Sequence, residues 1–318
     1  MESNSFEAQV SLELKHFRSS LGKARLNQAI ATLARPSAIK SAFHLALEYA
    51  MIAVAAYLVI GISYFFIPIS LVLLGSRQRA LVVLVHEGSH RNLFGAQRVN
   101  DSLTKWLCAI PMFISLDTYR EVHGEHHRFL GDPEHDSDYL HNPDLIKKGW
   151  VKVYFSELFS LESWLGNTFG YPLKWKAGRV YLAWWSLITI VALCVASVES
   201  ITTFVILWFA ARASVYHAII SFVIISDHVG LVPGGILGFA RNHPSGGVLR
   251  LIIHPYYNGL HLAHHLLPTV PYHNLKKAHD LLLSEVNYKQ AEHCQSYFFG
   301  EHSVIFSWCK CNRMEDRS

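Results

Sequence analysis

The sequence predicts an all-α integral membrane protein with about four transmembrane helices arranged as two hairpins. Hydrophobic residues make up 51% of its 318 residues and charged residues only 16%. Soluble domains carry about 25% charged residues, so this chain has few water-facing groups for its size. Long stretches without Lys or Arg alternate with segments rich in them, which is the charge pattern of a multi-pass membrane protein.

The first hairpin is predicted from the charge-poor stretch 42–75, which contains no Lys or Arg and a single acid, Glu48. A helix of about 20 residues crosses a bilayer, so this stretch predicts two helices that turn near Gly61–Ser63. Because Arg77 and Arg79 follow closely, we expect the second helix to leave the bilayer near Arg77 and to continue into the cytosol.

The second hairpin is predicted from two apolar stretches, Val180–Val198 and Ile201–Ser226, joined by a tight turn. Arg212 and His217 lie within the last of these stretches. Polar residues inside a membrane span are candidates for function, because burying them there is costly. The alternative interpretation is that Arg212 faces a neighbouring helix or extends its guanidinium to the membrane surface.

The distribution of Lys and Arg predicts the orientation. Both turns between the predicted spans lack these residues, whereas the N-terminal segment, residues 77–176 and the C-terminal region are rich in them. Positively charged segments stay in the cytoplasm, so we expect both termini there. The predicted organisation is a cytosolic N-terminal segment (1–41), a membrane and catalytic domain (42–275) and a cytosolic C-terminal tail (276–318). Within the first segment, Leu12–Leu33 has the pattern of an amphipathic helix lying on the membrane.

Three histidine clusters are the most informative feature of the sequence. The chain has 20 histidines, and eight of them fall in groups with helical spacing: His86 and His90; His123, His126 and His127; His261, His264 and His265. Residues three or four apart share a helix face, so each group can direct its imidazoles at one point, as a metal ion requires. At this histidine content an H-x-x-H-H triplet is expected about 0.08 times by chance. Two occur, so chance does not explain them.

Eight imidazoles are more than one ion can bind, since zinc takes four ligands and iron at most six. Two ions are therefore expected. A set of nitrogen ligands without thiolate suits iron, copper, nickel or zinc. Two iron ions that activate oxygen at the cytosolic face of the membrane are the most economical choice.

The order and spacing of these clusters resemble the membrane fatty acid desaturase family. The resemblance covers residues 71–275 and includes Gly131–Asp136, Asn258–His261 and Leu266–Pro268. It implies a cytosolic helical cap that holds a di-iron site, with O2 as co-substrate. It also implies that two hydrogens are removed from an acyl chain, with electrons from an external ferredoxin, rubredoxin or cytochrome b5 and its reductase.

The same resemblance suggests roles for four further residues. The family has a ninth histidine ligand after the last span, and His228 matches that place. Asp227 stands where the family often has Glu, and its carboxylate is a candidate for orienting the adjacent imidazole. Glu87, inside the first cluster, is a candidate for accepting a hydrogen bond from a ligand imidazole, and the alternative is a solvated acid. Asn258 is a candidate for holding a metal-bound water.

Other functions compete with desaturation. A hydroxylase or ketolase of the same superfamily has the same ligands and differs only in outcome. A membrane zinc metalloprotease would use His86-Glu87-x-x-His90 with Glu87 as general base, but it leaves six clustered histidines unused. A metal transporter would need ligands along the spans. The substrate is open between a long-chain acyl lipid and a small amphiphilic metabolite.

The remaining features predict no further activity. The net charge of +4 and the lack of a basic stripe argue against nucleic-acid binding. Cys309 and Cys311 form a C-x-C pair that is expected to be two free thiols. His243–Gly247 is similar to the haem-ligand motif of cytochrome b5 but has an extra residue. We expect a loop there and no fused electron-transfer domain.

Overall fold

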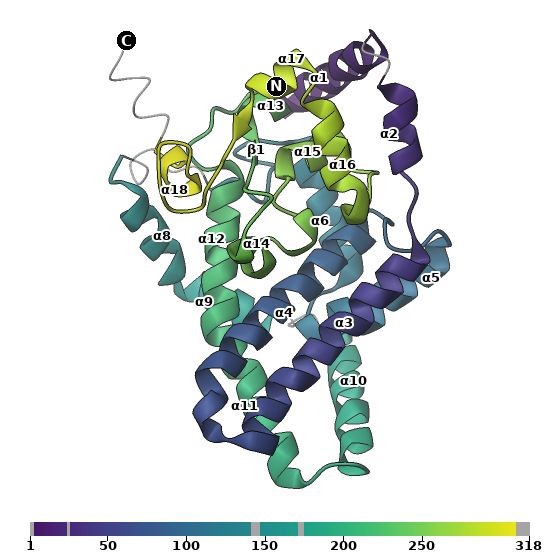
Figure 1. The fold of residues 1–318 in the computed structure, drawn as a ribbon, viewed down its shortest axis with the longest axis vertical. Coiled ribbons are helices and arrows are strands. Elements are labelled where there is room, and N and C mark those ends of the chain that lie inside the picture. Colours follow the sequence, from purple (N-terminus) through teal and green to yellow (C-terminus); the bar gives the residue numbers. More distant parts are fainter. Residues whose placement is uncertain (1–2, 24–25, 141–146, 171–174, 310–318) are drawn as a thin grey trace. The chain divides into compact units, whose positions relative to one another are not determined.

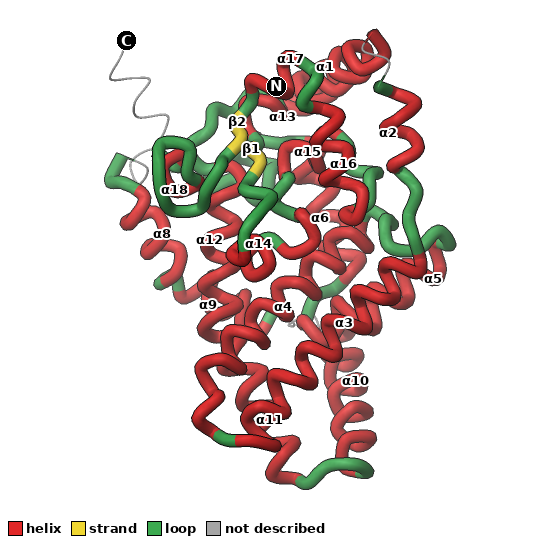
Figure 2. Tube along the Cα trace, in the orientation of Figure 1, coloured by secondary structure: helices red, strands yellow, loops and turns green. Residues whose placement is uncertain are grey.

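The computed structural model describes residues 3–23, 26–140, 147–170 and 175–309, which are mostly helical (Figures 1 and 2). This confirms the predicted helical fold, to which the structure adds one parallel pair of two-residue strands. The helices are α1 (Ser3–Lys23), α2 (Asn27–Leu33), α3 (Ala38–Tyr57), α4 (Ile67–Ser89), α5 (Gln97–Thr104), α6 (Leu116–Arg128), α8 (Trp150–Leu158), α9 (Leu161–Phe169), α10 (Trp175–Leu193), α11 (Val198–Ala211), α12 (His217–His228), α13 (Ile236–Phe239), α14 (Val248–Ile253), α15 (His261–Leu266), α16 (Tyr272–Leu282), α17 (Val286–Gln290) and α18 (Val304–Ser307), and the strands are β1 (Arg241–Asn242) and β2 (Glu292–His293).

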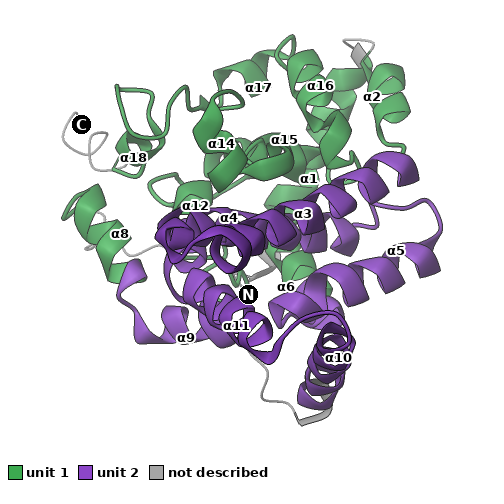
Figure 3. Ribbon diagram, turned by 60° about the horizontal axis from the view of Figure 1, so that its bottom comes forward, with its two compact units in different colours: residues 1–36, 120–157, 222–318 green, residues 37–119, 158–221 purple. Residues whose placement is uncertain are grey.

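The chain packs into two compact units, which Figure 3 distinguishes by colour. The first unit comprises residues 1–36, 120–157 and 222–318, and the second comprises residues 37–119 and 158–221. Each unit draws on more than one of the three segments expected from the sequence. The division into functional domains therefore stays a prediction.

The first two predicted spans form α3 and α4, which run side by side in the second unit (Figures 1 and 3). Ala38–Ile62 and Tyr64–Ser89 are each long and apolar enough to cross a bilayer. The chain reverses at Ser63, which is extended, so the predicted turn is confirmed. As expected, α4 continues without a break past Arg77, whose guanidinium lies 3.1 Å from the Glu48 carboxylate of α3.

A third stretch, Val198–His228, is also long and apolar enough to cross a bilayer. It comprises α11 and α12 with a π-helical turn between them at Arg212–Tyr216. The helix begins three residues earlier than predicted, because the Ser197 hydroxyl caps it by accepting from the Ser200 N–H at 3.1 Å. The remaining predicted span corresponds to α10, whose apolar part, Gly178–Leu193, is shorter. A fourth crossing therefore stays a prediction.

Arg212 and His217 hold the second unit together. The buried Arg212 guanidinium donates to the carbonyl oxygens of Thr168 (2.7 Å) and Asn167 (2.6 Å), at the end of α9. The His217 ring contacts the Asn167 amide at 3.0 Å and the Leu158 carbonyl at 2.9 Å. Arg212 thus satisfies two backbone carbonyls at the end of α9, and His217 satisfies the last carbonyl of α8. This supports the interpretation that Arg212 faces a neighbouring helix.

The N-terminal helices belong to the core of the first unit. Val10, Phe17 and Leu21 of α1 and Ile30 of α2 are buried in the same apolar cluster as Leu262, on the third histidine helix. Their apolar face is therefore covered by protein, which differs from the expectation of a helix lying on the membrane.

Candidate metal centre

Four imidazoles of the first unit converge on one point. They come from three helices: His126 from α6, His228 from the end of α12, and His261 and His265 from one face of α15. Their Nε2 atoms form a chain of close approaches, with distances of 3.2 Å (His126–His265), 3.0 Å (His265–His261) and 2.9 Å (His261–His228). All four side chains are buried. We call these residues the four-histidine group.

The outer nitrogens of two of these rings have fixed hydrogen-bond partners. His228 Nδ1 lies 2.6 Å from the Phe239 carbonyl oxygen, and His126 Nδ1 lies 2.6 Å from Asp136 Oδ1. Because a carbonyl or carboxylate oxygen can only accept, Nδ1 carries the proton in each ring. The Nε2 atoms then present lone pairs to the centre of the group, which is the tautomer that binds a metal.

The pKa values favour neutral inner rings. Burial, followed by the neighbouring His127, lowers the pKa of His265 well below its usual value. Burial also lowers the pKa of His261, although Asp227 opposes it. The His126–Asp136 pair behaves differently. Burial alone would lower the pKa of His126, but the negative charges of Asp138 and Asp136 raise it. Burial alone would raise the pKa of Asp136, but its hydrogen bonds with His126 and with the Gly131 N–H lower it.

This donor set fits a metal ion. For metal–nitrogen bonds of about 2.0–2.1 Å, two ligands of one ion lie roughly 2.9 Å apart at a right angle and roughly 3.4 Å apart at the tetrahedral angle. The Nε2 separations of 2.9–3.2 Å fall in this range. Neutral rings whose lone pairs face one another at this distance repel, and a cation at the centre removes the repulsion.

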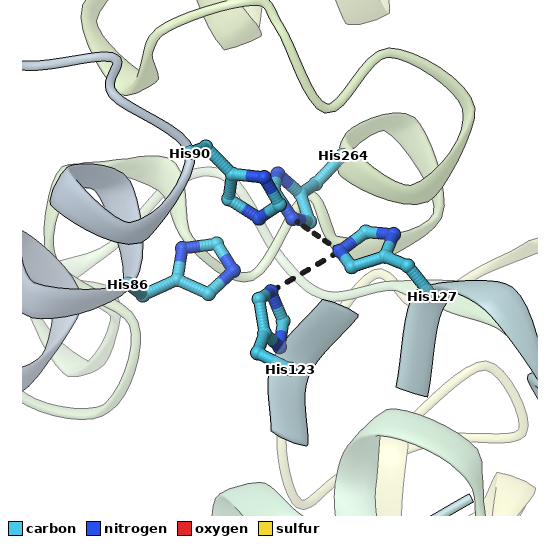
Figure 4. Close-up of side chains that lie close together, drawn as sticks. All are labelled: His86, His90, His123, His127 and His264. Carbon is cyan, nitrogen blue, oxygen red and sulfur yellow. Dashed lines mark hydrogen bonds between the residues drawn. The ribbon is translucent and has the colours of Figure 1, made fainter. Parts of the chain in front are cut away.

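A second group of imidazoles adjoins the first in the same unit. His123 Nε2 and His264 Nε2 each lie 3.1 Å from His127 Nε2 (Figure 4). The triplet on α6 therefore divides. His126 belongs to the four-histidine group, whereas His123 and His127 turn to the second group. The triplet on α15 divides in the same way, with His264 in the second group.

The second unit supplies His86 and His90 at the C-terminal end of α4, with ring centroids 5.1 Å apart. The packing of α5 fixes this end of the helix. Asn100 donates to the Gly88 carbonyl at 2.9 Å, and a Cβ on Gly88 would lie 2.2 Å from the Thr104 hydroxyl, so only glycine fits. The sequence predicts that this pair binds metal together with the other clustered histidines, and that assignment stays a proposal.

The candidates for supporting the metal ligands have different surroundings. Glu87 is buried and its carboxylate lies 3.2 Å from His86 Nδ1. The Asp227 carboxylate accepts from His243 Nε2 at 2.8 Å and lies 3.9 Å from His261 Nδ1. It does not hold the Nδ1 of the adjacent His228, which donates to Phe239. Asn258 lies in the turn before α15, and its proposed water contact stays a prediction.

Two further groups support metal-ligand candidates and were not predicted from the sequence: the Asp136 carboxylate and the Phe239 carbonyl. Asp136 lies in the stretch Gly131–Asp136 that resembles the family, but nothing in its spacing assigned it to His126. It also accepts from the Gly131 N–H at 2.8 Å, which anchors the loop. The Phe239 carbonyl is a backbone group and carries no sequence signal. The prediction for the C-x-C pair stays open, because Cys309 is half-buried and Cys311 lies outside the described residues.

The part of the chain that the structure describes is a helical protein with three helices long and apolar enough to cross a membrane and with histidine groups that could hold a metal ion. Residues 62–298 match the family model described as fatty acid desaturase. The chain therefore belongs to the fatty acid desaturase family, and it is an oxidoreductase. It is also 25% identical to the dihydrorhizobitoxine desaturase of Bradyrhizobium elkanii over 91% of this chain and 89% of the relative. Because the chain belongs to an oxidoreductase family, we reject the alternative that it is a zinc metalloprotease.

Proposed function

We propose that the protein is an oxygen-dependent di-iron desaturase that introduces a C=C bond into an aliphatic chain. The observation that carries the proposal is the four-histidine group, whose buried Nε2 atoms face one another. Family membership favours iron among the metals that suit a nitrogen-rich set. Bound iron would supply oxygen activation, which is needed to remove hydrogen from an unactivated C–H bond.

We propose that His86 and His90 also bind iron. The sequence places them among eight clustered imidazoles, and His228 brings the proposed ligands to nine, which is more than one ion can bind. The chain would therefore bind two ions through these nine imidazoles. Glu87 would support His86 by its contact with Nδ1 of that ring.

The other residues of the centre act on the ligands and on water. Asp136 and the Phe239 carbonyl keep the proton of two rings on Nδ1, so that Nε2 stays available. The nearly complete burial of the four-histidine group keeps bulk water away, which protects a strongly oxidising reaction from side reactions. A separate ferredoxin, rubredoxin or cytochrome b5, with its reductase, would supply the electrons.

A long-chain acyl lipid is the first candidate substrate, because the family model is that of fatty acid desaturases. A small amphiphilic metabolite is the second. This second candidate is favoured by the Bradyrhizobium relative, which is named as a desaturase of dihydrorhizobitoxine.

Product analysis distinguishes these substrates. The chain is co-produced with each type of electron donor and its reductase, and lipids and small metabolites are compared by mass spectrometry with cells that carry His265→Ala. We expect a product that has lost two hydrogens and depends on O2. A new double bond in acyl chains supports the first substrate, and one in a small metabolite supports the second. An added oxygen atom in place of desaturation would show a hydroxylase, and no O2-dependent product with any donor would contradict the proposal.

We also propose that both termini and the histidine clusters face the cytoplasm. The support is the excess of Lys and Arg in the N-terminal segment, in residues 77–176 and in the C-terminal region. A reporter that is active only in the cytoplasm, fused after Ser318, should therefore be active. Activity of a reporter that works only on the opposite side would contradict this orientation.

A further inference from the structure

We propose that His243 is a positioning residue for the metal centre and acts on the ligand His261 through Asp227. The proposal rests on the proposed function, because it concerns how one ligand of the four-histidine group is held. His243 lies directly after β1, and its side chain is completely buried. The sequence predicted only a loop at this position.

The first step is the contact between His243 and Asp227. Nε2 of His243 donates to Asp227 Oδ1 at 2.8 Å, and the second carboxylate oxygen, Oδ2, faces His261 Nδ1 at 3.9 Å. This distance is longer than a hydrogen bond, so Asp227 acts on His261 through its charge. A negative charge on this side favours the proton on Nδ1 and leaves the Nε2 lone pair directed at His228 and His265.

This arrangement parallels the support of two other ligands of the group. The Asp136 carboxylate faces Nδ1 of His126, and the Phe239 carbonyl faces Nδ1 of His228. Asp227 occupies the equivalent place for His261. Groups of this kind orient a histidine and increase its basicity toward the metal. His243 differs from Asp136 and Phe239 because it does not face a ligand itself but holds Asp227, which does.

The position of His243 is itself fixed from two directions. Its backbone N–H donates to the Gly259 carbonyl at 2.7 Å, two residues before the third histidine helix begins. Its ring stacks on that of His254, with centroids 4.3 Å apart and planes 19° apart. A Cβ on Gly259 would lie 2.8 Å from the His254 ring and 3.0 Å from His243 Cβ, so glycine permits this packing.

A third ring extends the stack. Tyr297 stacks on His254 with centroids 5.7 Å apart, and its hydroxyl lies 3.1 Å from His254 Nδ1. The C-terminal region of the chain thereby braces the residue that holds Asp227. Rigid support matters here because a metal ligand must be held within a fraction of an ångström of its bound position.

The test compares His243→Ala with His243→Gln in the full-length protein in detergent. The glutamine amide can donate to Asp227 from nearly the position of the imidazole Nε2. Metal-free protein is titrated with Co²⁺ and followed by its visible absorption, Fe²⁺ binding is measured separately, and the melting temperature of the metal-free protein is recorded. We expect His243→Ala to weaken one of two Co²⁺ sites by about 10–100-fold, and His243→Gln to restore most of that affinity.

A double-mutant cycle tests whether His243 acts through Asp227. In an Asp227→Asn background, the further change His243→Ala should alter Co²⁺ affinity by less than about 3-fold, because the carboxylate that it holds is gone. Independent effects of the two changes would overturn the proposal. So would a lower melting temperature with unchanged Co²⁺ affinity and spectrum. Three Co²⁺ ions per wild-type chain, with the third lost in His243→Ala, would overturn it as well, because His243 would then be a metal ligand itself. If the wild-type chain bound no metal, the proposed function would fail instead.

Discussion

Replacing His265 with alanine is expected to lower the iron content from two ions per chain to one and to abolish desaturation. His265 is the middle ligand of the four-histidine group, since its Nε2 lies 3.2 Å from that of His126 and 3.0 Å from that of His261. The side chain is buried, so its truncation removes one of the four converging nitrogens and leaves a cavity in the group. Mutating a residue that supports a metal ligand typically lowers activity by about 10–100-fold, and losing a ligand should lower it further. We therefore expect activity below about 1% of wild type.

Iron in the purified variant is measured by elemental analysis and compared with that of His302→Ala. His302 is an exposed histidine of the same unit and does not belong to any of the three clusters. This control should keep both ions and full activity. Two bound irons and normal turnover in His265→Ala would show that the four-histidine group is not a metal site.

Replacing Asp136 with asparagine is expected to weaken iron binding and to lower activity by about 10–100-fold. One carboxylate oxygen accepts from His126 Nδ1 at 2.6 Å and the other accepts from the Gly131 N–H at 2.8 Å. An asparagine amide must turn its NH2 toward one of these donors, so one hydrogen bond is lost. The negative charge that increases the basicity of His126 is also lost.

Asp132→Asn is the matched control, because Asp132 is a buried acid of the same loop. Its carboxylate accepts from the Glu134 N–H at 2.9 Å and lies 3.2 Å from Nδ1 of His135, a histidine outside the clusters. Both variants disturb the loop, but only Asp136→Asn should reduce the affinity for iron. Equal losses of iron affinity in the two variants would mean that loop stability, and not the support of His126, is responsible.

The membrane helices were predictable because their signal is local. An uninterrupted apolar stretch of sufficient length indicates a span wherever it occurs, and three such stretches are present in the structure. The exact start of a helix is less predictable. The Ser197 cap places the start of α11 earlier than the apolar pattern suggested. The fold of the N-terminal segment was not predictable either, because an amphipathic helix can cover a membrane or a protein core equally well.

The supporting residues show the limit of sequence patterns more clearly. Asp227 was selected because it precedes His228, but consecutive residues of a helix point about 100° apart. Its carboxylate therefore contacts His243 and faces His261. Asp136 had no pattern that linked it to His126, because that link depends on the course of the loop between them.

The sequence by itself determined that this protein is helical, rich in membrane-length segments and equipped with histidines that face one way on their helices. Hydropathy and helical period are properties of neighbouring residues, so both can be read without a structure. Only the tertiary structure decided that each H-x-x-H-H triplet is shared between two groups. His126 and His265 are 139 residues apart in the sequence, and their Nε2 atoms meet only because the fold of the first unit brings the two rings together. Contacts between residues so far apart in the sequence depend on the whole fold, and they determine which nitrogens can bind the same ion.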